Sequence, residues 1–177
     1  MRFHNLVLAS AAAASPAMAQ ADLCKAQITN DDLVGAYTLS IGNAIMTGGD
    51  KVIPLEVQNT MPVTIYAVGD DLIMGEPPNA VQLSLVGADE PDWQWDAHKG
   101  LSAISSEDFA YVVDCPVANL PRIVGTGTSS STEGTEITFT YRLIAWSLGD
   151  NGAEMVGALQ WSGGGISQKR VVMMTAQ

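Results

Sequence analysis

The sequence predicts an all-β protein, most simply a small antiparallel up-and-down β-barrel, with a two-layer β-sandwich as the alternative. Short strand-like runs are separated by Gly, Pro, Asn and Asp, and no stretch holds a helical apolar period for three turns. In the clearest run, Ile137, Phe139 and Tyr141 alternate with Thr138 and Thr140. Such alternation indicates a sheet with one face in a core and one face in solvent.

The expected strands follow from this alternation and from the turn residues between them. The same period of two recurs in residues 63–67 and 81–85, where every second side chain is aliphatic. We expect strands at residues 35–41, 52–58, 63–68, 71–75, 80–86, 109–115, 123–128, 136–146, 154–161 and 169–175.

Loops and turns are predicted where the alternation stops. Residues 87–106 contain Pro91 and are expected to form a long loop with at most one helical turn near its end. Residues 127–134 are rich in Ser, Thr and Gly and are expected to form a flexible hairpin tip. The turn residues at 149–152 and 162–165 predict that the end of the chain is a three-stranded antiparallel meander.

The N-terminus has the three parts of a secretory signal peptide. Arg2 supplies a positive charge, residues 6–14 supply a short apolar run, and residues 17–19 form an Ala-x-Ala cleavage site. We expect cleavage after Ala19, which leaves residues 20–177 as a single β domain in the periplasm or outside the cell. The apolar run is too short for a membrane anchor, so no integral membrane insertion is expected.

The charge balance argues against one class of partner. The chain has 8 Lys and Arg against 19 Asp and Glu, a formal net charge of −11 at pH 7. Nucleic acids and anionic lipid surfaces are bound through clusters of Lys and Arg. We therefore expect no nucleic-acid partner, and basic protein surfaces or cations are favoured electrostatically.

The chain has two cysteines, Cys24 and Cys115. In an oxidising compartment an even pair of cysteines forms a disulfide by default. This bridge closes a loop of about 90 residues, which in the chain-entropy model contributes roughly 4 to 4.7 kcal/mol. The wide separation excludes the Cys-x-x-Cys patterns of redox, zinc and haem-attachment sites.

The candidate binding site predicted from sequence lies in the expected long loop. Residues 89–98 combine acidic side chains with two tryptophans and a histidine. Tryptophans stack on sugars or aromatic ligands, and carboxylates accept hydroxyls or a cation. The alternative is an acidic surface loop whose tryptophans cap the end of a barrel. The candidate ligand-binding residues are Asp92, Trp93, Trp95, Asp96 and His98.

We expect no catalytic residues, no metal and no cofactor. His98 is a candidate base, but a hydrolytic triad also needs a nucleophile on a tight turn, and the sequence has no Gly-x-Ser-x-Gly. The histidines for catalytic zinc are missing, and the acidic runs at 89–96 and 150–154 do not match an EF-hand loop. The scattered methionines are expected to fill the core and not to bind copper.

One local resemblance favours the barrel over the sandwich. The segment Gly35-Ala36-Tyr37 resembles the Gly-x-Trp opening strand of lipocalin-like and related calycin barrels, with Tyr in place of Trp. The resemblance implies that Arg170, on the last expected strand, is the late basic residue that such families stack over this aromatic. It also implies a function in binding a ligand or a partner protein.

Three functional classes are compatible with these features. The first is an exported, non-catalytic binding or accessory protein that holds a small apolar or aromatic ligand in the barrel. The second is a protein-interaction module, such as a periplasmic inhibitor or an accessory subunit of an envelope complex. The third is a carboxylate-based carbohydrate-active enzyme, which needs two carboxylates that converge in a cleft. An open apolar interior favours the first class, and a filled interior with a flat exposed patch favours the second.

We predict that Cys24 and Cys115 are bridged in the exported protein. Cys115→Ser should lower the melting temperature, because the loop constraint on the unfolded chain is lost, and should free one reactive thiol. Intact-mass analysis with thiol labelling of periplasmically expressed protein checks this. Two free thiols in the unchanged protein contradict it.

Overall fold

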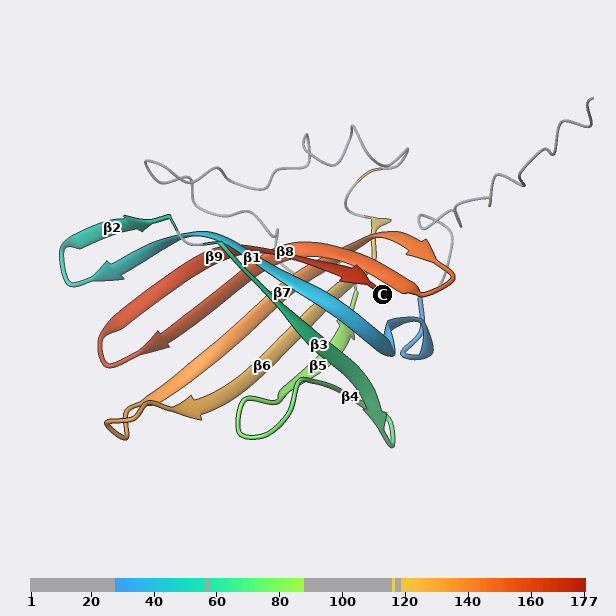
Figure 1. The fold of residues 1–177 in the computed structure, drawn as a ribbon, viewed down its shortest axis with the longest axis horizontal. Helices are drawn as coiled ribbons and strands as arrows, with labels where there is room; N and C mark the ends of the chain where they lie inside the picture. The colour runs from blue at the N-terminus through green and yellow to red at the C-terminus, as the bar shows by residue number, and fades with distance from the viewer. Residues whose placement is uncertain (1–27, 57, 88–115, 117–118) are drawn as a thin grey trace, which may run out of the picture.

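The computed structural model describes residues 28–56, 58–87, 116 and 119–177. Within them, nine strands form one sheet, and a single turn of 3-10 helix, η1 (Asp31–Leu33), precedes the first strand (Figure 1). The predicted all-β class is confirmed. The strands are β1 (Gly35–Gly48), β2 (Lys51–Leu55), β3 (Asn59–Val68), β4 (Asp71–Met74), β5 (Val81–Val86), β6 (Arg122–Ser130), β7 (Glu136–Gly149), β8 (Gly152–Gly163) and β9 (Ile166–Ala176).

The sheet closes into a barrel of eight strands. From β3 to β9 each strand pairs antiparallel with the next strand of the chain. Strand β1 pairs with β3 along one edge and with β9 along the other, which completes the ring. The up-and-down barrel is therefore confirmed, and the β-sandwich alternative is wrong.

Strand β2 stands outside this ring. The first part of β1, residues 35–41, pairs with β3, whereas residues 44–48 pair with β2. The pairing of β1 with β9 shifts register between Ile41 and Ala44, so a bulge lies at the point where β1 changes partners. The strand expected at 52–58 corresponds to β2, which ends at Leu55, and β3 begins only at Asn59.

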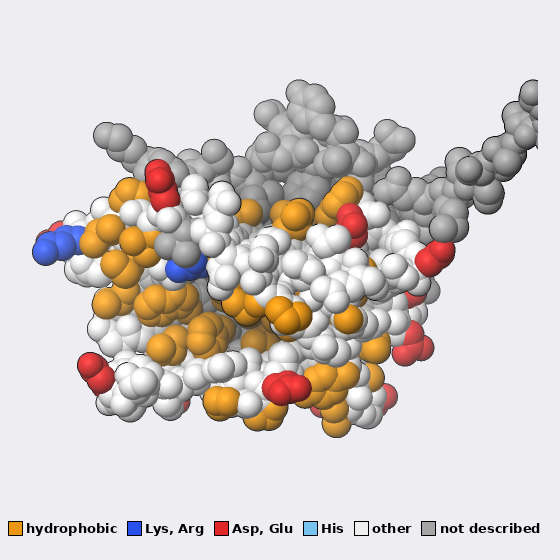
Figure 2. All heavy atoms as spheres, viewed as in Figure 1, with side chains coloured by type: hydrophobic (Ala, Val, Ile, Leu, Met, Phe, Trp, Pro, Cys, Tyr) orange, Lys and Arg blue, Asp and Glu red, His pale blue; other side chains and the backbone are white. Residues whose placement is uncertain are grey.

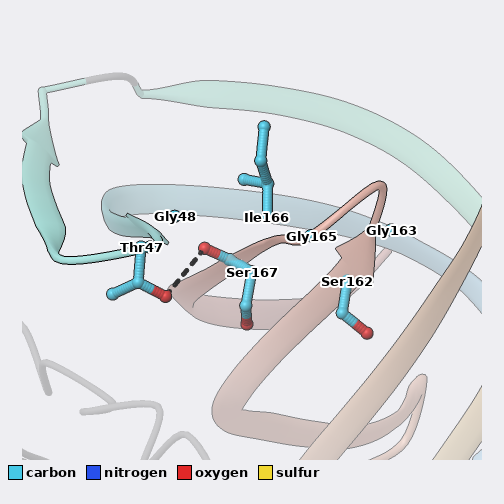
Figure 3. Close-up of a pocket in the computed structure, with 8 residues that line it drawn as sticks. Thr47, Gly48, Ser162, Gly163, Gly165, Ile166 and Ser167 are labelled. Atoms are coloured by element: carbon cyan, nitrogen blue, oxygen red, sulfur yellow. Dashed lines mark hydrogen bonds between the residues drawn. The ribbon is translucent and has the colours of Figure 1, made fainter.

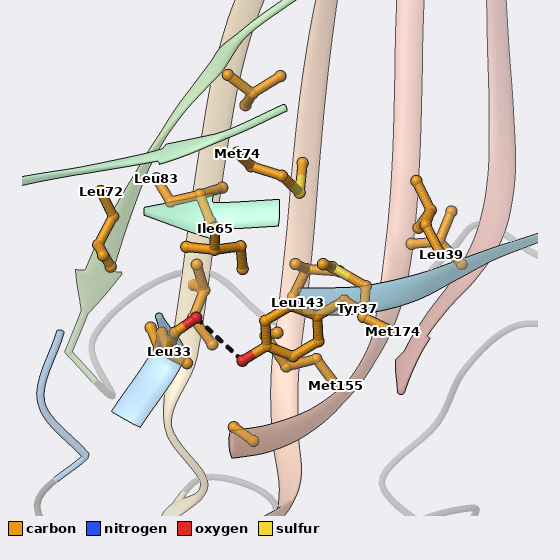
Figure 4. Packing of buried hydrophobic residues seen from close by; sticks show 14 of the residues in the cluster. Leu33, Tyr37, Leu39, Ile65, Leu72, Met74, Leu83, Leu143, Met155 and Met174 are labelled. Carbon is orange, nitrogen blue, oxygen red and sulfur yellow. Dashed lines mark hydrogen bonds between the residues drawn. The ribbon is translucent and has the colours of Figure 1, made fainter. Parts of the chain in front are cut away.

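The end of the barrel that holds η1 is filled, and we call it the closed end. Leu33 of η1 and Tyr37 of β1 are fully buried, and the Tyr37 hydroxyl donates a hydrogen bond to the Leu33 carbonyl oxygen at 3.0 Å (Figure 4). Asn30 Nδ2 donates to the carbonyl oxygen of Asp70 at 3.0 Å, which ties η1 to the turn between β3 and β4. The helical turn therefore acts as a plug.

The core extends from the closed end into the middle of the barrel, where it includes Leu159, and is built from inward-facing side chains of all eight ring strands. Three of the methionines lie in it, as the sequence predicts, whereas Met61 and Met173 are exposed. The buried cluster comprises Leu33, Tyr37, Leu39, Ile65, Leu72, Met74, Val81, Leu83, Ile123, Leu143, Ala145, Ala153, Met155, Leu159, Val172 and Met174.

The predicted C-terminal meander is confirmed as β7, β8 and β9. Gly149 pairs with Gly152 across the first turn, and Gly164 and Gly165 make the second turn with φ of 58° and 78°. The predicted hairpin tip at 127–134 begins too early, because β6 continues to Ser130.

Several predictions fall outside the described residues. These are the signal peptide, the disulfide between Cys24 and Cys115, the strand at 109–115 and nearly all of the loop at 87–106. In the described part of the chain, no helix is long and apolar enough to span a membrane.

We predict that Tyr37→Phe lowers the free energy of unfolding by about 1 to 3 kcal/mol, because the buried Leu33 carbonyl loses its hydrogen-bond donor. Urea unfolding followed by circular dichroism measures this. Tyr66→Phe is the matched control, since Tyr66 is only half-buried and lies on the opposite face of β3 from the core residue Ile65. Equal stability of the two variants contradicts the plug.

Candidate functional site

The other end of the barrel, where the β1–β2, β6–β7 and β8–β9 hairpins lie, is hollow, and we call it the open end. Strand β4 has 4 residues and β5 has 6, whereas β7 and β8 have 14 and 12. The long strands therefore extend beyond the short ones and leave one side of the wall missing. Figure 2 shows hydrophobic side chains gathered in a hollow there, on the left of the view.

Two rows of side chains face this hollow. Residues directly opposite each other in an antiparallel pair share a face, so the register defines each row. Both rows lie on the inner face, because they are two or four residues along from core residues such as Leu143 and Val172. The row nearer the mouth is Gly127, Phe139, Trp161, Gln168 and Met46. The row nearer the core is Gly125, Tyr141, Leu159, Arg170 and Ala44.

Glycines on β6 let neighbouring side chains close one side of the hollow. A Cβ on Gly125 would lie 2.5 Å from Leu83 Cδ2, and one on Gly127 would lie 2.8 Å from the Ala80 carbonyl oxygen. Residues 80–83 thus lie directly over β6, in the space that a side chain at position 125 or 127 would occupy if it were larger than glycine. The aromatic residues of β7 and β8 form the wall next to this packed surface.

A short hydrogen-bonded chain crosses the apolar wall. Gln168 is only 4% exposed, and its Oε1 accepts hydrogen bonds from Trp161 Nε1 and from Arg170 Nε, the latter at 2.9 Å. The amide oxygen is thereby satisfied, and it holds the indole and the guanidinium beside each other.

Arg170 is the only charged side chain at the inward positions of the eight described ring strands. It is half-buried, and in the described part of the chain no carboxylate forms an ion pair with it. Its Nε atom bonds to Gln168, and no described residue accepts a hydrogen bond from its Nη atoms. The site therefore combines an aromatic wall with one guanidinium that still has donors to offer.

Two small hollows widen the mouth of the open end. One, of about 310 Å³, lies between the β1–β2 and β8–β9 hairpin tips, where Thr47 Oγ1 donates to the Ser167 carbonyl oxygen at 3.4 Å (Figure 3). The second, of about 290 Å³, is lined by Pro78, residues 128–130 and Glu136. Ile166 is a large apolar side chain on the rim of the first hollow, whereas the second is lined mostly by polar side chains.

The residues predicted as a site from sequence, Asp92, Trp93, Trp95, Asp96 and His98, lie outside the described residues and remain a prediction. The second acidic run, residues 150–154, lies in the described part of the chain, where Asp150 and Asn151 form the β7–β8 turn at the closed end. Within the described ranges, no group of three or more His, Cys, Asp or Glu is arranged to hold a metal ion.

The predicted stacking of Arg170 over Tyr37 is wrong. Tyr37 pairs with Ala176 on β9, whereas Arg170 pairs with Ala44 and Leu159. Six residues of strand separate the two positions, or about 20 Å. Arg170 thus belongs to the open end and Tyr37 to the plug of the closed end.

The sequence contains a signal for this site that composition alone does not reveal. On β9, Gln168 and Arg170 occupy the same alternating positions as the buried Val172 and Met174. Two polar residues on the core face of a strand indicate either a paired network or a binding site.

Comparison with protein-family models, with curated proteins and with solved structures finds no match for this chain.

We predict that Tyr141→Phe reduces the loss of stability above about pH 10. Burial raises the pKa of the Tyr141 hydroxyl from its ordinary value of 10.0, because desolvation disfavours the phenolate. The folded state holds this proton more tightly than the unfolded chain, so the stabilisation is complete below about pH 10 and is lost as the pH rises further. Urea unfolding over a pH series measures the slope. An unchanged slope in Tyr141→Phe contradicts the prediction.

Proposed function

We propose that this protein is an exported, non-catalytic binding protein that holds a small apolar or aromatic ligand in the open end of its barrel. The observation that supports this most directly is that Phe139, Tyr141 and Trp161 are inward-facing and only half-buried at the open end of a barrel whose other end is filled. The lipocalin-like resemblance of residues 35–37 agrees with such a role, and export rests on the signal-like residues 1–19.

The aromatic wall has the geometry of a binding surface. Phe139 and Trp161 are directly opposite each other on β7 and β8, so their Cβ atoms are about 5 Å apart and their rings form continuous apolar area. Both side chains are only half-buried, as is Tyr141. A ligand that covers them removes apolar surface from water at about 25 cal/mol per Å², and aromatic contact adds about 0.5 to 1.5 kcal/mol.

The filled end makes the hollow rigid. The strands that bear the aromatic residues run directly into the core, where Leu143, Met155 and Val172 are fully or almost fully buried. A wall fixed before the ligand arrives costs less conformational entropy on binding. The inward residues at the open end position a ligand, and among those described there is no His, Cys, Asp or Glu to act as a general base or nucleophile, which favours binding over catalysis there.

Binding of a neutral fluorescent dye, N-phenyl-1-naphthylamine, tests the proposal. We predict that Phe139→Ala weakens dye binding about five- to a hundredfold, as expected for loss of a contact worth roughly 1 to 3 kcal/mol. Met173→Ala is the control, because Met173 is a large apolar side chain that is 43% exposed and lies on the outer face of β9. Thermal melts check that both variants fold. Absence of dye binding, or equal binding by all three proteins, contradicts the proposed function.

A further inference from the structure

We infer that the ligand has an anionic, oxygen-bearing head group that binds Arg170, so that the natural ligand is an apolar or aromatic acid. This inference rests on the proposed function and specifies the chemical class of ligand for the same site. It is carried by the only charged inward side chain of the described ring strands and by the way in which Gln168 holds it.

The contact with Gln168 leaves the useful face of the guanidinium available. Among the described residues only Nε has a partner, Gln168 Oε1 at 2.9 Å, and neither Nη group donates to another described residue. A carboxylate or sulfonate accepts two parallel N–H···O bonds from this fork of two Nη groups. A neutral amide or hydroxyl lacks the negative charge that complements the guanidinium. Gln168 is itself fixed by Trp161, so the fork is oriented before the ligand binds.

The surroundings of Arg170 make an anion the favoured partner. Its row neighbours are Leu159 on β8 and Ala44 on β1, and the next row toward the mouth contains Met46. A cation beside apolar side chains loses favourable hydration free energy, and a hydrogen-bonded anion compensates for that loss. Glu136 lines the second hollow at the mouth, but no acidic side chain occupies an inward position of the described ring strands to serve as that anion.

The overall charge decides which anions bind. A chain of net charge −11 repels anions at long range, so a free inorganic anion gains little from approaching it. Screening limits this repulsion to about 8 Å at physiological ionic strength. An anion therefore reaches Arg170 when an attached apolar body is bound by the wall of Phe139 and Trp161, which selects an amphiphile. Because indole and guanidinium donate to one oxygen, the head group binds beside the Trp161 ring.

Three probes with the same ring system test the inference: 2-naphthoate, 2-naphthalenesulfonate and the neutral 2-naphthamide. Displacement of N-phenyl-1-naphthylamine at pH 7 gives the affinities. The unchanged protein should bind the anions at least tenfold more tightly than the amide. Arg170→Gln should abolish this preference by weakening the anions at least tenfold, while the amide is affected less than twofold. Arg170→Lys keeps the charge without the fork and should retain part of the preference.

Arg142→Gln is the matched control, because Arg142 is an exposed arginine on the outer face of β7 and should leave all three affinities unchanged. If the amide and the dye bind while the anions show no preference, the inference is overturned and the proposed function stands. If Arg170→Gln and Arg170→Lys weaken the anions and the amide equally, Arg170 has a structural role and the inference also fails. If neither dye nor probes bind, the proposed function fails with it.

Discussion

The pairing of β1 with β9 is the constraint on which the rest of the structure depends. It joins residues 37–48 to residues 166–176, so the two ends of the described sheet become one continuous ring. Once the ring is closed, each strand has an inward and an outward face, and a residue's place in the alternation decides whether it meets core or solvent. The core cluster and the candidate site both follow from this one closure, because each consists of residues that share the inward face.

The bulge between Ile41 and Ala44 then marks the boundary between the two ends of the barrel. Before it, β1 exchanges hydrogen bonds with β3 and helps to enclose the core; after it, β1 pairs with β2, which leaves the ring. The short strands β4 and β5 give the same result on the facing side, since they end before the hairpins of β6 to β9 do. One continuous inner surface is therefore packed with aliphatic side chains at one end and exposed as an aromatic wall at the other.

Much of the fold is predictable from the sequence, because strict alternation in segments such as 136–146 and glycine-rich turns are local signals. The end of β2 at Leu55 and the start of β3 at Asn59 are not local signals, because the two strands pair with different parts of β1. The candidate site at Gln168 and Arg170 is not a local signal either. Composition drew attention to residues 89–98, whereas Gln168 and Arg170 gain their meaning from register with Trp161 and Leu159. The resemblance placed Arg170 over Tyr37, and register alone shows that the two lie at opposite ends.

The remaining question in physical terms is why an arginine occupies an inward position at all. A leucine there would continue the apolar surface of Leu159 and Val172 without the desolvation cost of a charge. Within residues 28–56, 58–87, 116 and 119–177, the cost is only partly offset by Gln168, whose oxygen accepts from Nε, since no residue in these ranges accepts from the Nη atoms. A buried glutamine and a tryptophan N–H are both committed to holding this one guanidinium. Such an arrangement adds little to folding stability compared with an apolar alternative, and on our proposal its gain comes when an acid binds and fills the fork.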